Sequence, residues 1–157
     1  MIDSDLVVCG SFEKDGTMRW EQEVFLNPSG IASIVHNAID LSNFRDISVG
    51  SDIFLNFLMK SSSYPSATPI TIEIRGARDS SLLDWSIIST SKTENFSSAL
   101  SRGFVSIPLN VCADKYRYLF SRIFLENVPA MSFELFGYFS NVPLLENKIY
   151  PSGWGIA

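Results

Sequence analysis

The fold is decided by the stretch Ile70-Thr71-Ile72-Glu73-Ile74-Arg75, in which apolar and polar side chains alternate without a break. Alternation with a period of two is typical of a β-strand that buries one face and exposes the other. We therefore expect the three isoleucines to point into a core. The threonine, the glutamate and the arginine are expected to point away from it.

Similar runs on both sides of this stretch predict further strands. Residues 53–59 are apolar almost throughout, which indicates a strand covered on both faces. Other strands are expected at residues 85–91, 104–109, 116–126 and 132–140, with weaker candidates at 21–26 and 31–39. On the long strand at 116–126, one face should carry Tyr118, Phe120 and Phe124, and the other Leu119, Ile123 and Leu125. Trp85 begins an apolar strand and is expected in the core.

Turn-forming residues separate these runs, and one segment alone looks helical. Residues 93–102 are expected to form a turn or two of helix, capped by Thr93 or Asn95 and ended near Gly103. The run Asp79-Ser80-Ser81 is expected to be ordinary turn chemistry. Seven or eight short strands with almost no helix predict an antiparallel sandwich or barrel.

The composition bounds the classes of function. The chain has 157 residues, of which 46% are hydrophobic and 18% are charged. An average soluble domain has about 25% charged residues, so we expect part of this surface to be covered by a partner. The net charge of −5 argues against direct binding of nucleic acid, which needs a basic surface. No apolar run approaches the length of a membrane helix, so no membrane partner is expected.

Patterns along the chain suggest its organisation. We expect residues 1–30 to form an N-terminal segment, either an arm or an edge strand. Residues 31–157 should form a single β-sandwich domain, with the turn-rich residues 141–157 docked on it as a tail. The first residues carry two acids before a short apolar run, which does not fit a secretory signal. The protein is therefore expected to be made in a cytoplasm, with Cys9 and Cys112 reduced.

The sequence lacks the usual signatures of catalysis. It contains no Gly-x-Ser-x-Gly elbow, no glycine-rich phosphate loop and no calcium-binding loop of the EF-hand type. The single histidine, His36, is expected to be a hydrogen-bonded structural residue rather than a general base. We therefore expect no enzyme activity, no cofactor and no metal. The remaining functional candidates are aromatic, because Trp20 and Trp154 fit either a sugar-stacking platform or the anchors of a protein interface.

Several short motifs follow one another in an order that is found in one family. They are Asn37-Ala38-Ile39-Asp40-Leu41, Arg45-Asp46-Ile47 with Gly50, the apolar run 53–59, Thr71-Ile72-Glu73-Ile74-Arg75 with Asp79, Ile107-Pro108-Leu109, Arg117-Tyr118-Leu119 and Tyr150-Pro151-Ser152-Gly153-Trp154. They lie between Asn37 and Trp154, a span of about three quarters of the chain, and this part resembles the small capsid cement (decoration) proteins of tailed bacteriophages, of the type first seen in a Bordetella podophage. The first 30 or so residues depart from that pattern.

The resemblance implies a fold and a role. It implies an all-β, jelly-roll-like antiparallel sandwich that pairs as a homodimer and performs no reaction. It also implies a structural virion protein on the outer surface of an icosahedral capsid, where it stabilises the shell by bridging subunits of the major capsid protein. Many weak bridges on one particle add up by avidity.

Candidate interface residues come from three parts of the chain. They are Trp20 and Phe25 in the N-terminal segment, Asp40, Phe44, Arg45 and Asp46 in the opening motif, and Tyr150 and Trp154 in the tail. The alternative function is a carbohydrate-binding β-sandwich module of a tail or host-attachment structure. A hydrolase that uses His36, and another minor virion role such as a head–tail connector, also stay open.

Overall fold

The computed structural model describes residues 7–25, 31–41, 53–61, 68–109, 116–126, 131–141 and 143–144. The strands are β1 (Val7–Cys9), β2 (Ser11–Phe12), β3 (Met18–Arg19), β4 (Glu21–Phe25), β5 (Ile31–Val35), β6 (Ile39–Asp40), β7 (Phe54–Lys60), β8 (Pro69–Ala77), β9 (Trp85–Thr90), β10 (Glu94–Asn95), β11 (Phe104–Pro108), β12 (Tyr118–Glu126) and β13 (Met131–Ser140). One helix, α1 (Phe96–Arg102), lies between β10 and β11. The predicted all-β class is confirmed, and the two weaker strand candidates at 21–26 and 31–39 are present.

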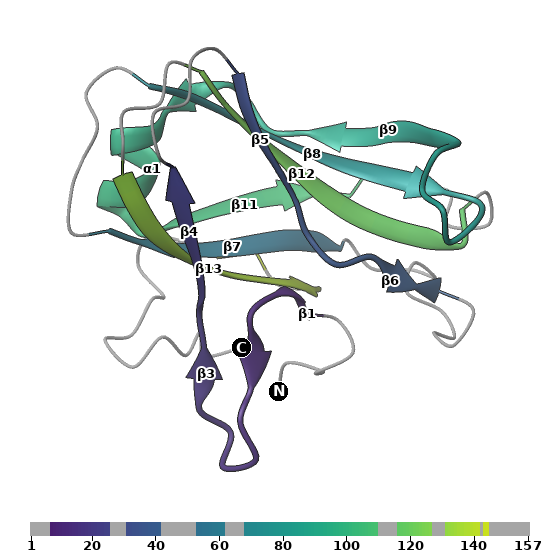
Figure 1. Cartoon of the computed structure of the whole chain (residues 1–157), viewed down its shortest axis with the longest axis horizontal. Helices are drawn as coiled ribbons and strands as arrows, with labels where there is room; N and C mark the ends of the chain where they lie inside the picture. Colours follow the sequence, from purple (N-terminus) through teal and green to yellow (C-terminus); the bar gives the residue numbers. More distant parts are fainter. Residues whose placement is uncertain are drawn as a thin grey trace.

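The strands form two antiparallel sheets that face each other, with a separate small hairpin of β2 and β3 (Figure 1). In the first sheet β1 and β4 both pair with β13, followed by β7 and β11. In the second sheet β9 and β10 both pair with β8, followed by β12, which pairs with β5 and β6. Three pairs of short strands lie end to end along one neighbour: β1 with β4, β5 with β6, and β9 with β10. If each pair is counted as one strand and the β2–β3 hairpin is left out, eight strands remain. Numbered again in chain order, they lie in the order 1-8-3-6 in the first sheet and 2-7-4-5 in the second. This order is that of a jelly roll, so the predicted sandwich is confirmed in its topology.

The core lies between the inner faces of the two sheets. Ile70, Ile72 and Ile74 of β8 are buried there, as their alternation predicts. The inner face of β12 contributes Leu119, Ile123 and Leu125, and that of β13 contributes Phe133, Leu135 and Phe139. Strand β7 is covered on both faces, also as predicted. Fully burying side chains of this kind contributes about 1.5–3 kcal/mol each, which makes this core the main source of stability.

A second, smaller apolar cluster lies on the outer face of the first sheet. It is centred on Leu58, Phe104, Phe136 and Tyr138, and Phe12, Met18 and Trp20 of the N-terminal hairpin pack against it. The rings of Phe12 and Phe136 meet edge to face, with centroids 5.2 Å apart. The hairpin therefore covers its own sheet, while β1 and β4 serve as edge strands of that sheet. Beyond position 140 the structure describes residues 141, 143 and 144, and Leu144 packs against this cluster.

The expected short helix is present, with its N-cap position at Asn95 as one of the two predicted choices, but the side-chain capping bond is not formed. The helix begins at Phe96. Thr93 does not cap the helix, because its hydroxyl is hydrogen-bonded to that of Thr71, 2.8 Å away. The end of the helix agrees with the prediction, since Gly103 has a φ of 78° and its N–H donates to the carbonyls of Ala99 and Leu100.

The prediction that Trp85 lies in the core is wrong, because Trp85 is 41% exposed and lies outside the core. A register shift between β8 and β9 at Ile74 and Arg75 leaves Ile88 unpaired, so the alternation of β9 is interrupted. Before this irregularity Trp85 and Ile87 share the outer face of the sheet with Arg75. After it, Ser89 is buried and donates its hydroxyl to the carbonyl of Pro108.

Candidate binding face

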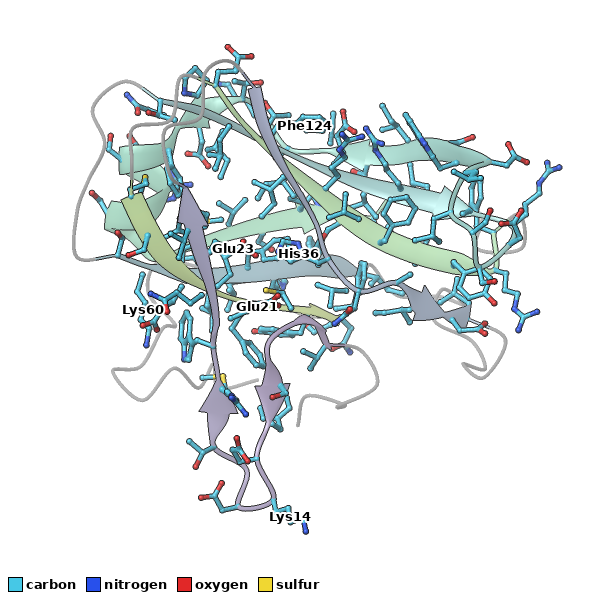
Figure 2. All side chains as sticks on the ribbon, viewed as in Figure 1. Lys14, Glu21, Glu23, His36, Lys60 and Phe124 are labelled. Atoms are coloured by element: carbon cyan, nitrogen blue, oxygen red, sulfur yellow. The ribbon has the colours of Figure 1, made fainter. Side chains whose placement is uncertain are left out.

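The outer face of the second sheet carries an unusual set of aromatic, aliphatic and charged side chains. We call it the aromatic face. Its members are Val35 of β5, Glu73 and Arg75 of β8, Trp85 and Ile87 of β9, and Tyr118, Phe120, Arg122 and Phe124 of β12. Direct cross-strand pairing sets Phe120 opposite Arg75 and Arg122 opposite Glu73. Figure 2 shows the side chains along this sheet, with Phe124 labelled near one end.

Arg75 organises the centre of this face. Its Nε and Nη2 donate to Oε2 of Glu73 at 2.8 and 2.6 Å. Its guanidinium carbon lies 3.6 Å from the centre of the Trp85 indole ring and 5.5 Å from that of Phe124. Only 4% of Arg75 is exposed, although its strand position points it away from the core. The expected outward direction is therefore confirmed, and the arginine is covered by its own aromatic neighbour.

A second set of contacts extends the face across β12 to β6. The guanidinium of Arg122 lies 4.9 Å from the ring centre of Phe124, and that of Arg117 lies 5.2 Å from that of Tyr118. Arg117 donates from Nε and Nη2 to the two carboxylate oxygens of Asp40 at 3.1 and 3.0 Å. The hydrogen bonds and charge of Asp40 raise the pKa of Arg117. Arg75 and Arg117 each pair with a carboxylate as well as stacking on a ring, so the face combines ion pairs with apolar rings.

Large apolar side chains reach the solvent at several points around this face. Val35 is 53% exposed, Ile87 52% and Trp85 41%, and Leu83, just before β9, is 83% exposed. Single exposed apolar residues are ordinary on a protein surface, but Trp85 and Ile87 stand two positions apart on one strand. Gathered aromatic, arginine and aliphatic side chains are typical of the centre of a protein-binding surface.

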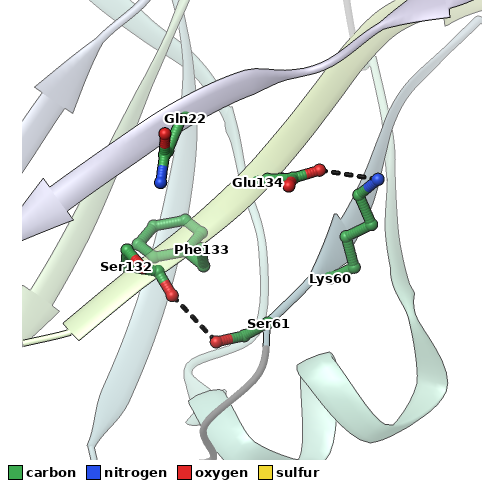
Figure 3. A pocket seen from close by; sticks show the side chains of 6 residues that line it. All are labelled: Gln22, Lys60, Ser61, Ser132, Phe133 and Glu134. Carbon is green, nitrogen blue, oxygen red and sulfur yellow. Dashed lines mark hydrogen bonds and ion pairs between the residues drawn. The ribbon is translucent and has the colours of Figure 1, made fainter.

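A polar hollow of about 330 Å³ lies elsewhere, at the meeting of β4, β7 and β13 (Figure 3). It is lined by Gln22, Lys60, Ser61, Ser132, Phe133 and Glu134. Lys60 and Glu134 form an ion pair at 2.6 Å, and Ser61 donates to the carbonyl of Ser132 at 2.9 Å. Lys60, Glu134 and Ser61 therefore already have polar partners within the hollow.

Trp20 lies beside this hollow and contacts its own chain. The amine of Lys60 is 4.4 Å from its ring centre, and the ring of Phe136 is 6.2 Å away. The indole of Trp20 therefore contacts Lys60 and the smaller apolar cluster of its own chain.

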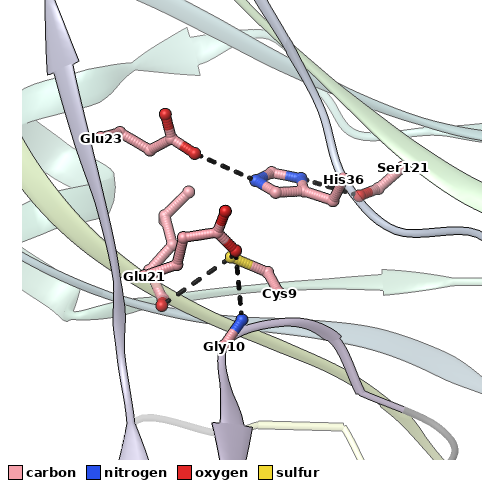
Figure 4. A network of polar contacts seen from close by, with 7 residues as sticks. Cys9, Gly10, Glu21, Glu23, His36 and Ser121 are labelled. Atoms are coloured by element: carbon pink, nitrogen blue, oxygen red, sulfur yellow. Dashed lines mark hydrogen bonds and ion pairs between the residues drawn. The ribbon is translucent and has the colours of Figure 1, made fainter.

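A buried polar network surrounds the single histidine (Figure 4). Nδ1 of His36 lies 3.1 Å from the hydroxyl oxygen of Ser121, and Nε2 lies 3.7 Å from Oε1 of Glu23. The prediction of a hydrogen-bonded histidine is confirmed, and the structure shows that its side chain is also buried. Glu23 belongs to the first sheet and Ser121 to the second, so His36 links the two layers at their β4–β5 side.

Cys9 stands in the same region. Its thiol donates to Oε2 of Glu21 at 3.2 Å, and the same oxygen accepts the N–H of Gly10 at 3.3 Å. Burial raises the pKa of the Cys9 thiol well above its ordinary value, and Glu21 and Glu23 raise it further. A thiol in this environment stays protonated, and only a thiolate is a competent nucleophile. Within the described parts of the chain, no group of three or more histidine, cysteine, aspartate or glutamate side chains is arranged to hold a metal ion.

The interface candidates predicted from the sequence lie in different places, and several lie outside the described residues. Trp20 is half-buried on its own sheet, and Asp40 is ion-paired at the border of the aromatic face. Phe25 ends β4 with its backbone paired to Met131, and its side chain lies outside the described part. The other five candidates fall outside the described residues: Phe44, Arg45, Asp46, Tyr150 and Trp154.

Sequence reasoning placed Tyr118, Phe120 and Phe124 on one face of their strand, but it missed that β9 adds Trp85 and Ile87 to the same surface. The signal available for β9 was the pair Ile87-Ile88, since two adjacent isoleucines in an alternating strand require either one exposed residue or an irregularity. The stacking of Arg75 on Trp85 joins two strands and had no signal in the sequence.

Comparisons with known proteins add little to this geometry. No family model matches the sequence, and no curated protein matches it. A structural match is the CBM22-2 xylan-binding domain from Paenibacillus barcinonensis Xyn10C, with a TM-score of 0.37 and 16% identity over 78% of this chain and 88% of that one. So slight a likeness does not carry xylan binding over to the present chain. The helix of the described structure is too short to cross a membrane.

Proposed function

We propose that this chain is a non-enzymatic structural protein of a phage virion, which binds the outside of the icosahedral capsid and stabilises it by bridging major capsid protein subunits. The observation that carries the proposal is the aromatic face, a sheet surface that exposes Val35, Trp85 and Ile87 around a covered arginine. Such a surface gains free energy when a protein partner removes it from water, at about 25 cal/mol per Å² of apolar area. The order of the short sequence motifs supports the major capsid protein as the partner.

The fold suits this role. A jelly roll is a rigid platform whose sheet faces are available for contact, and this one fixes Arg75 and Trp85 in place before any partner arrives. A pre-organised face avoids much of the entropic cost of ordering side chains on binding. Phage shells hold DNA under pressure, and even weak bridges between subunits protect them when present in many copies.

The proposal is tested by adding the purified protein to mature shells of its phage that lack it. We expect sedimentation with the shells in numbers of the same order as the major capsid protein, and a higher temperature of DNA release. Val35→Asp, which places a charge on the aromatic face, should abolish both effects. Val24→Asp is the matched control, because Val24 is 55% exposed on β4 of the other sheet. Failure of the unmodified protein to bind or protect the shells would refute the proposal.

A second candidate is a carbohydrate-binding module, which one observation favours. The indole of Trp85 lies on an outer sheet face and the residue is 41% exposed, and exposed aromatic rings stack on the apolar faces of sugars. Screening the protein on a glycan array, with Trp85→Ala as control, distinguishes this candidate. A signal that disappears in the Trp85→Ala protein supports it, whereas a blank array removes it.

A further inference from the structure

Strand β11 forms an edge of the first sheet. It pairs with β7 and, within the described residues, with no other strand (Figure 1). At one end of this pair the N–H of Met59 donates to the carbonyl of Gly103, and at the other end the N–H of Leu109 donates to the carbonyl of Ile53. Successive residues of an antiparallel strand alternate between bonding to the partner strand and pointing away from it. Ser106 lies three positions from Gly103 and from Leu109, so its N–H and carbonyl point away from β7.

The open part of this edge ends at Pro108. Proline has no N–H to offer to a further strand, and natural sheets use it to limit strand addition. Its carbonyl is already engaged, because it accepts the hydroxyl of Ser89 at 2.6 Å. Addition of a strand to β11 is therefore blocked at Pro108, while the outward backbone groups of Ser106 are left for a partner.

A hollow of about 330 Å³ runs along the same edge. Every residue from Phe104 to Pro108 lines it, so the space lies beside the strand rather than at one of its ends. Leu144 adds an apolar side chain to the lining, and Thr90 and Ser91 add hydroxyl groups. An extended peptide fits such a space, because its backbone pairs with the strand edge while its side chains enter the hollow.

The charges around the hollow favour an acidic occupant. Arg102 donates from Nη2 to Oε1 of Glu94 at 2.7 Å, so this acid and this base neutralise each other. Lys92 lines the same hollow and is exposed, and it takes part in none of the ion pairs of the described residues. An aspartate or glutamate of a bound segment would neutralise Lys92.

We propose that β11 binds an extended, acidic segment of a partner protein as an added strand of the first sheet. The backbone of the segment pairs with the outward groups of Ser106, and its acid pairs with Lys92. This inference rests on the capsid role proposed above, and the segment then belongs to a second major capsid protein subunit.

Bridging needs two separate contact surfaces on one copy of the chain. The aromatic face is the outer face of the second sheet, whereas β11 is an edge of the first sheet. One copy therefore holds one subunit by the aromatic face and another by β11. Loss of the β11 contact should leave attachment to the shell weaker but present, and should remove the bridge.

The test removes the N–H of Ser106, which does not belong to the ladder with β7. Ser106→Ala is the matched control for Ser106→Pro, because both lose the hydroxyl that is bonded to Asn56 and only the proline loses the N–H. On shells that lack the protein, Ser106→Pro should bind about tenfold more weakly than Ser106→Ala. At saturating concentration it should still cover the shells, but with less than about half the rise in the temperature of DNA release. Circular dichroism and thermal unfolding confirm that each variant is folded.

A second pair of variants tests the charge of the site and does not depend on the proline. Lys92→Glu places like charges together and should weaken shell binding about fivefold. Lys14→Glu is the same change at the exposed tip of the hairpin of β2 and β3 (Figure 2), and it should alter binding by less than about twofold.

Photo-crosslinking identifies the occupant of the hollow. Benzoylphenylalanine in place of Thr90, which is exposed and lines the hollow, should link the shell-bound protein to the major capsid protein. Links only to the chain's own residues 145–157, or only to a second copy, would overturn the proposal. So would equal binding and protection by Ser106→Pro and Ser106→Ala, or by Lys92→Glu and Lys14→Glu, on shells that bind the parent protein. If the parent protein itself does not bind, the capsid role fails and this inference fails with it.

Discussion

The ring of Phe57 packs directly against the backbone of Gly137, on the neighbouring strand of the first sheet. A methyl group on Gly137 would lie 2.8 Å from Cδ1 of Phe57 and 2.9 Å from Cγ2 of Val8, both closer than carbon atoms approach in proteins. Gly137 also pairs directly with Phe57 in the ladder between β13 and β7. The absence of a side chain at this one position lets a phenylalanine lie flat in the centre of the core.

This contact predicts that Gly137→Ala is destabilising. Overpacking of this kind costs about 2 kcal/mol of unfolding free energy, because Phe57 and Val8 are fully buried in the core. Urea unfolding measures the loss. Gly16→Ala is the control, since its methyl group meets nothing within 4 Å and pays only for its positive φ of 84°, about 1 kcal/mol. Equal losses at the two positions would show that the core near Phe57 is loosely packed.

The stacking of Arg75 on Trp85 predicts a measurable coupling. Arg75→Ala removes the partner of the Glu73 carboxylate, and breaking such a buried ion pair costs about 3 kcal/mol. A double-mutant cycle of Arg75→Ala and Trp85→Ala should give a coupling energy of about 1 kcal/mol for the cation–π contact. Arg78→Ala is the control, since Arg78 is exposed in the turn after β8. Additive effects of the two substitutions would mean that Trp85 only rests on Arg75 without stabilising it.

The raised pKa of Cys9 predicts a loss of stability at alkaline pH. Below pH 9 the thiol is protonated in both the folded and the unfolded chain, so it adds no pH dependence. Above pH 9 the unfolded chain releases the proton and the folded chain keeps it, so the free energy of unfolding falls by about 1.4 kcal/mol per pH unit. The difference between Cys9→Ala and the parent protein, both with Cys112→Ser, isolates this slope. Urea unfolding at several pH values between about 8 and 10.5 measures it, and a difference that stays constant would show that Cys9 titrates normally when folded.

The left-handed backbone at Leu82 predicts that a glycine variant is more stable than an alanine variant, the reverse of the usual order. At ordinary positions alanine is the more stable of the two, because glycine is more flexible in the unfolded chain. At Leu82, where φ is 57°, Leu82→Gly should be more stable than Leu82→Ala by about 1 kcal/mol. The neighbouring pair Leu83→Gly and Leu83→Ala should show the ordinary order. Thermal unfolding of the four variants gives the comparison, and an ordinary order at both positions would show that the turn relaxes without cost.

Sequence alternation was a good guide where a strand is regular. The isoleucines of β8 are buried as the sequence predicts, and β7 is covered on both faces as predicted. The side chains of β12 divide between its two faces in the predicted way. Alternation failed at Trp85, because the irregularity opposite Arg75 changes which side chains of β9 face the core. It also left open the place of Trp20, which the hairpin fold lays against Phe136.

The sequence by itself determined the β-class, the strands and most of the inward-facing residues, because the direction of a side chain along a regular strand depends only on its neighbours in the chain. Only the tertiary structure decided which residues meet on the outer sheet face and in the buried polar network. Glu73, Arg75 and Trp85 form one contact across two strands, and Cys9, Glu21, Glu23, His36 and Ser121 gather from strands up to 112 positions apart in number. These contacts depend on strand order and register, which are set by the packing of the whole core rather than by any local pattern.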